Sequence, residues 1–450
     1  MSHPPLLIVV LAAGMGVRMR SRRAKVLHAI AGRSLLGHVL ASAQAVGASQ
    51  IAVVVAPGMD AVSQEALKQA PGVAVFEQAT QAGTADALLA AAPALEGHSG
   101  DVLVLFADTP LLETATLKQL IASLARASIA VLGFQSNDPS GYGRLLLDAR
   151  GHVAGIREDK DASAAERAVR LCNAGAMAFR LPSLLALIRR IRNDNASGEY
   201  YLTDAIALAR ADGLVTAPVV CAREEAIGIN TREQLAIAEA IFQTRARAKA
   251  MREGVTMIAP DTVWLSYDTE IGRDVTIEPN VFLGPGVAIA EGAQILANCH
   301  IVGARIGAGA RVGPFARLRP GANVGADVHL GNFVEVKNAS LEQGAKANHL
   351  AYIGDGRVGA GANIGAGTIF CNYDGFNKHF TDVGKGAFIG SNAALVAPVR
   401  IGDGAYVGAG SVITRNVEAE ALVIERAQQQ VRPGWASKFR ALMQARKAKP

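Results

Sequence analysis

Aliphatic residues recur every six positions between Ile271 and Ile413. Period six fits neither an isolated helix, whose period is about 3.6, nor an alternating strand, whose period is about 2. It is typical of a left-handed parallel β-helix, in which short strands form flat sides and small residues turn the corners. A glycine-rich linker is the alternative, but a linker has no reason to keep an aliphatic register. The successive registers are Ile271-Ile277-Leu283-Ile289-Ile295-Ile301, Ile306-Val312-Leu318-Val324-Leu330-Val336, Leu341-Ala347-Ile353, Val358-Ile364-Phe370 and Val383-Ile389-Leu395-Ile401-Val407-Ile413.

The first half of the chain shows a different pattern, in which continuous apolar runs alternate with helical periodicity. Such runs predict a mostly parallel, Rossmann-like α/β sheet that is covered on both faces. In folds of this class, ligands bind at the carboxyl ends of the strands. The expected strands are Leu6–Leu11, Ile51–Val55, Val73–Phe76, Val102–Phe106 and Ile129–Phe134.

A helix is predicted between the two halves. Thr231 and Gln234 have the spacing of a capping box, helix-compatible residues continue to about Glu253, and Gly254 suits the C-terminal cap. A helix of this length would space the two halves by roughly 30 Å, so two independent sites are expected. The predicted domains are therefore 1–230, a linker helix at 231–253, and a β-helix domain at 254–450 that ends in a basic tail.

Composition narrows the class of protein. The chain has 450 residues and a formal net charge of +6, and the last twenty residues contain six basic and no acidic side chains. Because the tail accounts for the whole excess of positive charge, no nucleic-acid partner is expected for the folded domains.

The four cysteines have no CxxC spacing, which favours a reduced, cytoplasmic protein. The apolar run at residues 6–13 is too short to span a membrane, and no membrane insertion is expected.

The first strand ends in a loop that carries candidate phosphate ligands. Gly14 and Gly16 follow the strand, with Arg18 and Lys25 shortly after. Closely spaced glycines let backbone N–H groups turn toward phosphates, and the two cations add charge where a triphosphate would lie. The spacing is neither GxGxxG nor a P-loop, so from the pattern alone an ordinary turn is an equal alternative.

Asp108 closes the strand that ends at Phe106. A lone carboxylate at the carboxyl end of a strand suits a hard cation such as Mg²⁺, and a helix N-cap is the alternative interpretation.

Taken together, these two segments resemble the sugar-phosphate nucleotidyltransferases. The chain departs from that family at Val17, where threonine is usual, at Ala24, where proline is frequent, and at Phe106-Ala107, where an aromatic-glycine pair is common. The resemblance implies uridylyl transfer from UTP to a sugar 1-phosphate, with alignment and charge neutralisation as the source of catalysis. Catalytic roles are implied for Arg18 and Lys25, Mg²⁺ binding for Asp108 and Asn230, and a uracil-reading role for the segment around Gln78 and Gln81. The nucleotide and sugar contacts that it implies are Leu11, Ala12, Ala13, Gly14, Lys25, Gln78, Gly83, Thr84, Phe106, Ala107, Asp108, Gly143, Glu158, Asn173 and Asn230.

The six-residue period of the second half is interrupted between Phe370 and Val383 by the insertion Cys371-Asn372-Tyr373-Asp374-Gly375-Phe376-Asn377-Lys378. From composition alone, this insertion is either functional or a tolerated surface loop. Together with 333–337 (Phe-Val-Glu-Val-Lys) and 348–352 (Asn-His-Leu-Ala-Tyr), however, it resembles the bacterial bifunctional N-acetylglucosamine-1-phosphate uridyltransferases/glucosamine-1-phosphate acetyltransferases, over nearly the whole chain.

This resemblance implies a second reaction, acetyl transfer from acetyl-CoA to glucosamine 1-phosphate, so that the two activities make UDP-N-acetylglucosamine for peptidoglycan and lipopolysaccharide precursors. His349 is the implied general base, Glu335 orients or assists it, and Asn372 or a nearby backbone N–H stabilises the thioester oxygen. The implied sugar-phosphate ligands are Arg319, Lys337, Tyr352, Asn363 and Lys378. The implied acetyl-CoA contacts are Ala366, Asn372, Tyr373, Ser391, Ala409 and Arg426.

Three hypotheses follow from the sequence. The leading one is a two-site enzyme that assembles as a homotrimer and uses Mg²⁺, UTP, sugar 1-phosphates and acetyl-CoA. The second is a nucleotidyltransferase whose coil only assembles an oligomer, and the third is a non-enzymatic scaffold that senses sugar nucleotides. After Ile413 the period is lost, and Trp435 with its basic neighbours predicts a short helical tail that packs on a neighbouring coil or meets the phosphates of CoA.

Overall fold

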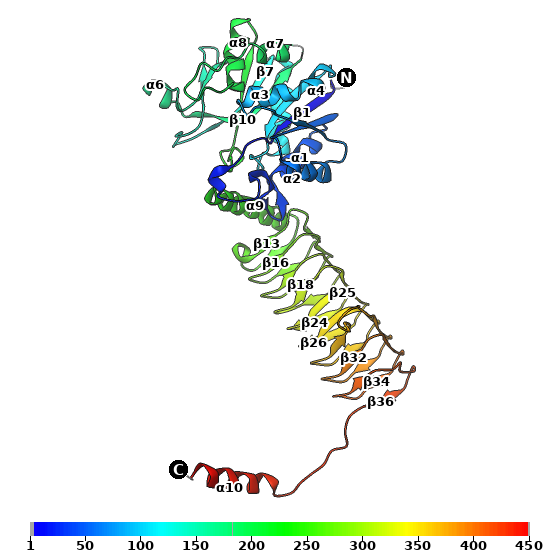
Figure 1. Ribbon diagram of the computed structural model, residues 1–450. Coiled ribbons are helices and arrows are strands. Elements are labelled where there is room, and N and C mark those ends of the chain that lie inside the picture. Colours follow the sequence, from blue (N-terminus) through cyan, green and yellow to red (C-terminus); the bar gives the residue numbers. More distant parts are fainter. Residues whose placement is uncertain (1–3, 182, 449–450) are drawn as a thin grey trace. The chain divides into compact units, whose positions relative to one another are not determined.

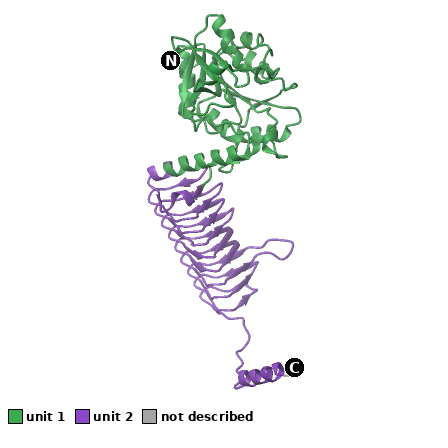
Figure 2. Cartoon of the chain, turned by 90° about the vertical axis from the view of Figure 1, so that its left-hand side faces the viewer, with its two compact units in different colours: residues 1–248, 265–267 green, residues 249–264, 268–450 purple. Residues whose placement is uncertain are grey.

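The computed structural model describes residues 4–181 and 183–448. The chain forms two compact units (Figure 2). Unit 1 contains residues 1–248 and 265–267, and unit 2 contains residues 249–264 and 268–450.

Unit 1 is built on a mixed sheet with the strand order β11-β7-β10-β6-β1-β4-β5, as far as the described residues show. Neighbouring strands in this order are parallel except β10, which runs antiparallel to β6 and β7. The five predicted strands are present within one residue at each end. The strands of the unit 1 sheet are β1 Leu6–Leu11, β4 Gln50–Val55, β5 Ala74–Glu77, β6 Asp101–Phe106, β7 Ile129–Gln135, β8 Arg144–Leu147, β9 Val153–Arg157, β10 Leu171–Arg180 and β11 Thr216–Cys221.

Helices cover both faces of this sheet (Figure 1). Strand β1 shows why a continuous apolar run is needed: Ile8 and Val10 enter one core, and Leu7 and Val9 enter the core on the opposite face. The first core is closed by α1 Leu35–Ala45, α2 Asp60–Gln69 and α5 Thr114–Ala122. The second is closed by α3 Thr84–Ala90, α7 Ser183–Ile188 and α8 Ala205–Ala211.

The expected helix between the halves is α9, Arg232–Arg252. Its capping box is present, because the Gln234 backbone N–H donates to Thr231 Oγ1 at 3.2 Å and the Thr231 backbone N–H donates to Gln234 Oε1 at 3.1 Å. The helix is not a bare spacer. Leu235, Ala238 and Phe242 lie in an apolar cluster of unit 1. Most of α9 is therefore part of unit 1.

Unit 2 is a coil of short parallel strands, as the six-residue period predicted. Before the insertion, register residues pair with those three hexapeptides later, as Ile277 with Ile295 and Leu283 with Ile301. Every register residue is buried except Ile271, which is half-buried at the first turn. Since three strands make one turn of the coil, the period of six records a turn of eighteen residues, and the slip after Ile301 is a turn that is one residue shorter.

The coil carries the segments that hold its candidate site. They are β22 Arg317–Leu318, β24 His329–Asn332, β25 Glu335–Leu341, β26 Lys346–His349, β27 Tyr352–Val358, β28 Asn363–Ile364, β29 Ile369–Cys371, β30 Thr381–Val383, β31 Phe388–Ile389 and β34 Tyr406–Val407. The predicted insertion begins with the last residue of β29 and continues toward β30, and a loop leaves the side of the coil in Figure 2.

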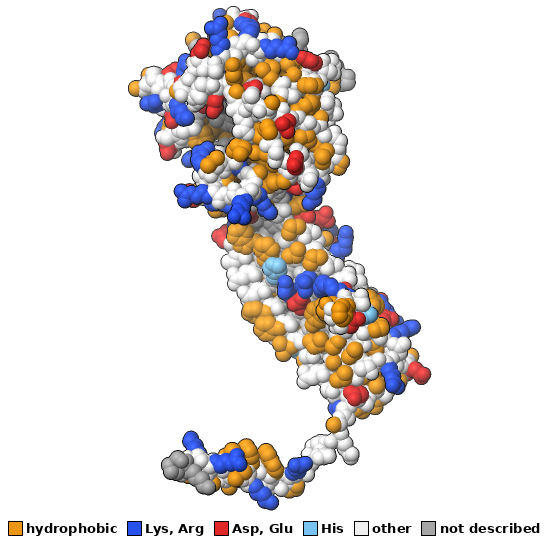
Figure 3. Space-filling model, viewed as in Figure 1, with side chains coloured by type: hydrophobic (Ala, Val, Ile, Leu, Met, Phe, Trp, Pro, Cys, Tyr) orange, Lys and Arg blue, Asp and Glu red, His pale blue; other side chains and the backbone are white. Residues whose placement is uncertain are grey.

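The tail ends in α10, Trp435–Lys447, on which no side chain is buried. Basic and hydrophobic side chains are interspersed along this helix (Figure 3). None of the described helices is long and apolar enough to cross a membrane.

Candidate functional sites

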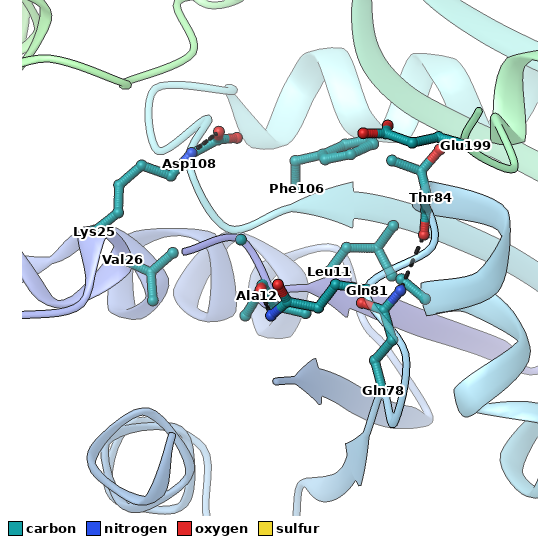
Figure 4. A pocket seen from close by; sticks show the side chains of 14 residues that line it. Leu11, Ala12, Lys25, Val26, Gln78, Gln81, Thr84, Phe106, Asp108 and Glu199 are labelled. Atoms are coloured by element: carbon teal, nitrogen blue, oxygen red, sulfur yellow. Dashed lines mark hydrogen bonds and ion pairs between the residues drawn. The ribbon is translucent and has the colours of Figure 1, made fainter. Parts of the chain in front are cut away.

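A pocket of about 280 Å³ opens where β1 and β6 end (Figure 4). This is the edge at which the parallel sheet was expected to bind its ligand. The pocket is lined by Leu11, Ala12, Ala13, Gly14, Lys25, Val26, Gln78, Gln81, Gly83, Thr84, Ala87, Phe106, Asp108 and Glu199.

Lys25 contacts both predicted Mg²⁺ ligands at one end of this pocket. Its ammonium donates to Asp108 Oδ2 at 2.6 Å and to Asn230 Oδ1 at 3.1 Å. Asp108 is held at the end of β6, and Gln234 accepts the Asn230 backbone N–H at 2.7 Å, which fixes Asn230 against the start of α9. The two oxygen atoms thus converge on one cation across 122 residues of sequence.

This pair fits Mg²⁺. Carboxylate and amide oxygens are hard donors, and Mg²⁺ is usually bound by one or two protein oxygens together with water and substrate phosphates. No group of three or more acidic, histidine or cysteine side chains lies close enough to hold a metal elsewhere in the described chain. Phosphates brought by a substrate would complete such a site.

The loop after β1 leaves room for phosphates. A side chain at Gly14 would meet no atom within 4 Å, so this position borders open space. Gly16 has φ +62°, and a Cβ there would lie 2.4 Å from Lys25 Cβ, so only glycine lets Lys25 approach. Arg18 follows in the short helix Val17–Met19 and is exposed, and no described residue pairs with its guanidinium.

Residues 200–202 hold the predicted uracil-reading segment in place through hydrogen bonds. The Tyr200 backbone N–H donates to the Ala82 carbonyl at 2.7 Å, and the Leu202 backbone N–H donates to Thr84 Oγ1 at 2.8 Å. This approach is possible because Gly83 has no side chain: a Cβ there would lie 2.5 Å from the Tyr200 carbonyl oxygen. Glu199 reaches the pocket on the same segment and was not predicted, because no local motif marks it.

The predicted sugar contacts come together beside the β8–β9 hairpin. The Asn173 backbone N–H donates to the Gly143 carbonyl at 2.7 Å, and a Cβ at Gly143 would lie 3.2 Å from both Glu158 carboxylate oxygens. Burial raises the pKa of the Glu158 carboxyl. A hydrogen bond from Thr203 opposes this in part, and the Asp161 and Asp204 carboxylates raise that pKa further. Gly143 directly precedes β8, Glu158 directly follows β9 and Asn173 lies on β10; these three strands were not expected from the sequence.

On the coil, His349 is oriented by a residue that the sequence did not single out. Its Nδ1 lies 2.7 Å from Asn332 Oδ1, and the two residues are register partners on β26 and β24. Because an amide oxygen only accepts, this contact favours the tautomer of the neutral imidazole with its proton on Nδ1 and a lone pair on Nε2. Glu335, the expected partner of the imidazole, instead pairs with Arg319 at 2.9 Å and Arg317 at 3.6 Å. Glu335 is the first residue of β25, which belongs to another face of the coil, and its neighbours there are Arg317 and Arg319.

Two of the predicted phosphate ligands lie together. Hydrogen bonding and charge repulsion from the Lys337 ammonium lower the pKa of Lys378. The Asp355 carboxylate and, to a smaller extent, Tyr352 oppose this lowering of the Lys378 pKa. Two neighbouring ammonium groups repel each other, and an anion bound between them would relieve this repulsion. Basic side chains also gather on the visible face of the coil in Figure 3.

Asp355 lies close enough to both lysines to feel their charges and was not predicted. It accepts from Asn338 Nδ2 at 2.7 Å and from the buried Asn372 amide. Burial alone would raise the pKa of Asp355, but these hydrogen bonds and the nearby lysine charges lower it overall. One N–H of Asn372 is therefore already used in holding the inserted loop.

The predicted acetyl-CoA contacts follow one corner of the coil. The carbonyl of Ala366 accepts from the Asn392 backbone N–H at 2.7 Å, and that of Ser391 accepts from the Gly410 backbone N–H at 2.8 Å. Arg426 Nη1 donates to the Ala409 carbonyl at 2.8 Å. Tyr373 is exposed on the loop. Asn363, which was predicted to bind the sugar phosphate, lies on β28 and is the register partner of Lys346 on β26, the strand that also carries His349. Ala366, Ser391 and Ala409 therefore occupy equivalent positions, each following a strand of the same sheet of the coil (β28, β31 and β34).

Comparison with known proteins identifies the family. Residues 8–174 match the model of the MobA-like NTP transferase domain, and residues 380–415 match the bacterial transferase hexapeptide model of six repeats. Proteins named "Bifunctional protein GlmU" match almost the whole chain. The chain belongs to the GlmU family. Its relative from Parvibaculum lavamentivorans is 58% identical over 96% of both chains. The relative from Azorhizobium caulinodans is 55% identical over 98% of both chains, and that from Paramagnetospirillum magneticum is 51% identical over the full length of both.

Family membership decides between the three hypotheses. The chain is a bifunctional transferase with a uridylyl-transfer and an acetyl-transfer activity, and the scaffold and sensor hypotheses are set aside.

Proposed function

We propose that the pocket of unit 1 is the uridylyl-transfer site and that Lys25, Asp108 and Asn230 form its reactive end. The observation that carries this assignment is the convergence of the Asp108 and Asn230 oxygens on the Lys25 ammonium, at 2.6 and 3.1 Å. Asp108 and Asn230 would hold Mg²⁺, which would supply positive charge beside the reacting phosphates. Lys25 and the exposed Arg18 add the protein's own positive charge for the triphosphate.

The reaction in this pocket needs alignment rather than a base. The phosphate of N-acetylglucosamine 1-phosphate is already anionic, so its oxygen can attack the α-phosphorus of UTP while pyrophosphate leaves. Gln78, Gly83 and Thr84 hold the uracil, and the backbone of residues 11–14 lies along the phosphates. Gly143, Glu158 and Asn173 hold the sugar, since they gather beside one hairpin.

We propose that His349 is the base of acetyl transfer on the coil. The free Nε2 takes a proton from the ammonium of glucosamine 1-phosphate, and the nitrogen then attacks the thioester carbonyl of acetyl-CoA. As the amide forms, the C–S bond breaks and CoA leaves as its thiolate, which takes up the second proton that the nitrogen loses. Arg319, Lys337, Tyr352, Asn363 and Lys378 hold the sugar phosphate. Because Glu335 pairs with Arg319, its role here is to orient that phosphate ligand rather than the imidazole.

The corner that runs through Ala366, Ser391 and Ala409 receives acetyl-CoA, and Arg426 closes its far end. Tyr373, which is exposed on the inserted loop, contacts the same ligand in this proposal. Asn372 or a backbone N–H near it meets the developing charge on the thioester oxygen.

We further propose the functional division predicted from the sequence: uridylyl transfer in 1–230, a connecting helix in 231–253 and acetyl transfer in 254–450. A homotrimer in the cytoplasm is part of this proposal. Exposed aromatic stacks on the coil support the assembly, because Phe282 lies on His300 at 4.9 Å and Phe388 on Tyr406 at 5.3 Å between ring centroids. Sedimentation of the purified chain measures the assembly directly.

The two assignments are tested by one pair of assays on the native protein and His349→Ala. Release of CoA from acetyl-CoA with glucosamine 1-phosphate should nearly stop in the variant. Release of pyrophosphate from UTP with N-acetylglucosamine 1-phosphate should be the same in both. If His349→Ala released CoA at the native rate, the proposed base would be wrong. A loss of both activities would show that the two sites are not separate.

A further inference from the structure

The amide of Gln78 is held in one orientation. Gln78 follows β5, is 4% exposed and lines the nucleotide pocket. Its Nε2 donates to Asp86 Oδ2 at 2.8 Å and to the Gly83 carbonyl at 3.1 Å. A carboxylate and a backbone carbonyl can only accept, so both contacts require the NH₂ end of the amide. Gln78 Oε1 accepts no hydrogen bond from the described residues and is the polar atom left for a ligand.

Asp86 is outside the pocket lining, on the first turn of α3. We infer that Asp86 is a positioning residue: it keeps the Gln78 carbonyl oxygen toward the nucleotide base and so makes the pocket select uracil over cytosine. This inference rests on the proposed binding of UTP in this pocket. It adds a residue that touches neither substrate nor metal.

The chemistry of the two bases makes the orientation decisive. Uracil carries a hydrogen on N3, whereas N3 of cytosine has a lone pair and accepts. A carbonyl oxygen at this position accepts a hydrogen bond from uracil and meets the cytosine lone pair with repulsion. A glutamine that could turn its amide over would offer its NH₂ group to cytosine instead. An acceptor-only partner behind the amide removes that alternative, and Asp86 is such a partner.

The Gly83 carbonyl also accepts from Nε2, but at 3.1 Å and without a full charge. A hydrogen bond to an ionised group is stronger than a neutral one, so the carboxylate contributes most of the preference. The contact depends on the turn between Gln78 and α3, which brings two residues eight positions apart to 2.8 Å.

Asp86 also has a plain structural role that must be separated from this one. It lies within 3.4 Å of both the Ala82 backbone N–H and Thr80 Oγ1, and a carboxylate in the first turn stabilises a helix. Loss of that role would lower the unfolding temperature and the rates with every nucleotide alike. It would not change the preference between two bases.

The test compares kcat/KM for UTP and CTP, with N-acetylglucosamine 1-phosphate and pyrophosphate release as the readout, in the native protein and Asp86→Asn. Asparagine has nearly the same shape but presents either an acceptor or a donor, so the Gln78 amide can turn over. We expect the UTP:CTP ratio to fall about tenfold, the difference between a charged and a neutral hydrogen bond. Asp86→Glu keeps an acceptor-only group and should restore much of the ratio. Glu77→Gln is the matched control, because Glu77 is adjacent, acidic and exposed, and its ratio should be native.

A native UTP:CTP ratio in Asp86→Asn, whatever its stability, overturns the inference. Gln78→Leu separates that result from a failure of the proposed function. If Gln78→Leu lowers the ratio and Asp86→Asn does not, Gln78 contacts the base but Asp86 does not position it. If neither variant changes the ratio, the pocket does not read the base through Gln78, and both the assignment of this residue and the inference are wrong.

Discussion

Replacing Gly83 with alanine should destabilise unit 1 and disturb the nucleotide pocket together. Gly83 has φ +126° and ψ −178°, a conformation that is nearly restricted to glycine and costs other residues about 1–3 kcal/mol. The new Cβ would also lie 2.5, 2.6 and 2.9 Å from backbone atoms of Tyr200, and an enforced contact of this kind costs about 1–3 kcal/mol. The expected loss is therefore about 2–6 kcal/mol. At about 2–4 °C per kcal/mol for a unit of this size, the unfolding midpoint should fall by roughly 10 °C.

The geometry of the nucleotide pocket should also be disturbed, because the Tyr200 backbone cannot move away without breaking its hydrogen bonds to the 82–85 segment. Thermal unfolding followed by circular dichroism gives the midpoint, and the KM for UTP reports the pocket. Gly58→Ala is the matched control: Gly58 has φ +72° in the same unit, but its Cβ would meet nothing within 4 Å. That change should cost only about 1 kcal/mol of backbone strain. Equal shifts in the two variants would show that the close approach of Tyr200 to Gly83 is absent from the protein.

Three further predictions concern the two sites. Because Lys337 lowers the pKa of Lys378, Lys378 loses its charge at a lower pH than an ordinary lysine. The kcat/KM for glucosamine 1-phosphate should therefore fall as the pH rises through the lowered pKa of Lys378. Lys337→Met should move the fall to higher pH, and an unchanged alkaline limb would contradict this reasoning. Asn332→Ala should lower the kcat of CoA release roughly ten- to hundredfold, since the base loses its orientation and tautomer. Native CoA release in Asn332→Ala would show that His349 needs no such partner. Asp108→Asn should lower pyrophosphate release by roughly a hundredfold or more and raise the Mg²⁺ concentration needed for half-maximal rate, and an unchanged Mg²⁺ titration would remove Asp108 from the metal site.

Much of the architecture could be predicted because it is encoded locally. The buried residue of each hexapeptide recurs at a fixed interval, so the coil was visible without any long-range information. The capping box of α9 and the strand that ends before Asp108 are local in the same sense. The unexpected strands of unit 1 have weaker patterns: β10 interrupts its apolar positions with Asn173 and Gly175, and it pairs with β6 and β7 across long stretches of chain.

The site residues divide along the same line. Lys25, Asp108, Asn230 and His349 could be named from motifs and the resemblance, but the contacts that Lys25 makes with Asp108 and Asn230, and the partner of His349, could not. Asn332 lies one coil turn before His349, and nothing in the sequence ranks it above Glu335, which the coil directs to Arg319 instead.

The sequence by itself determined the two classes of fold, the order of the two activities along the chain and the residue types that their chemistry requires. Only the tertiary structure decided which atoms meet: Asn230 with Lys25, Asn332 with His349 and Asp86 with Gln78. The physical reason is range. Periodicity and capping act over a few neighbouring residues, whereas the direction of a hydrogen bond depends on where the fold brings separate segments together, even when, as for Asp86, the partner is only a turn away.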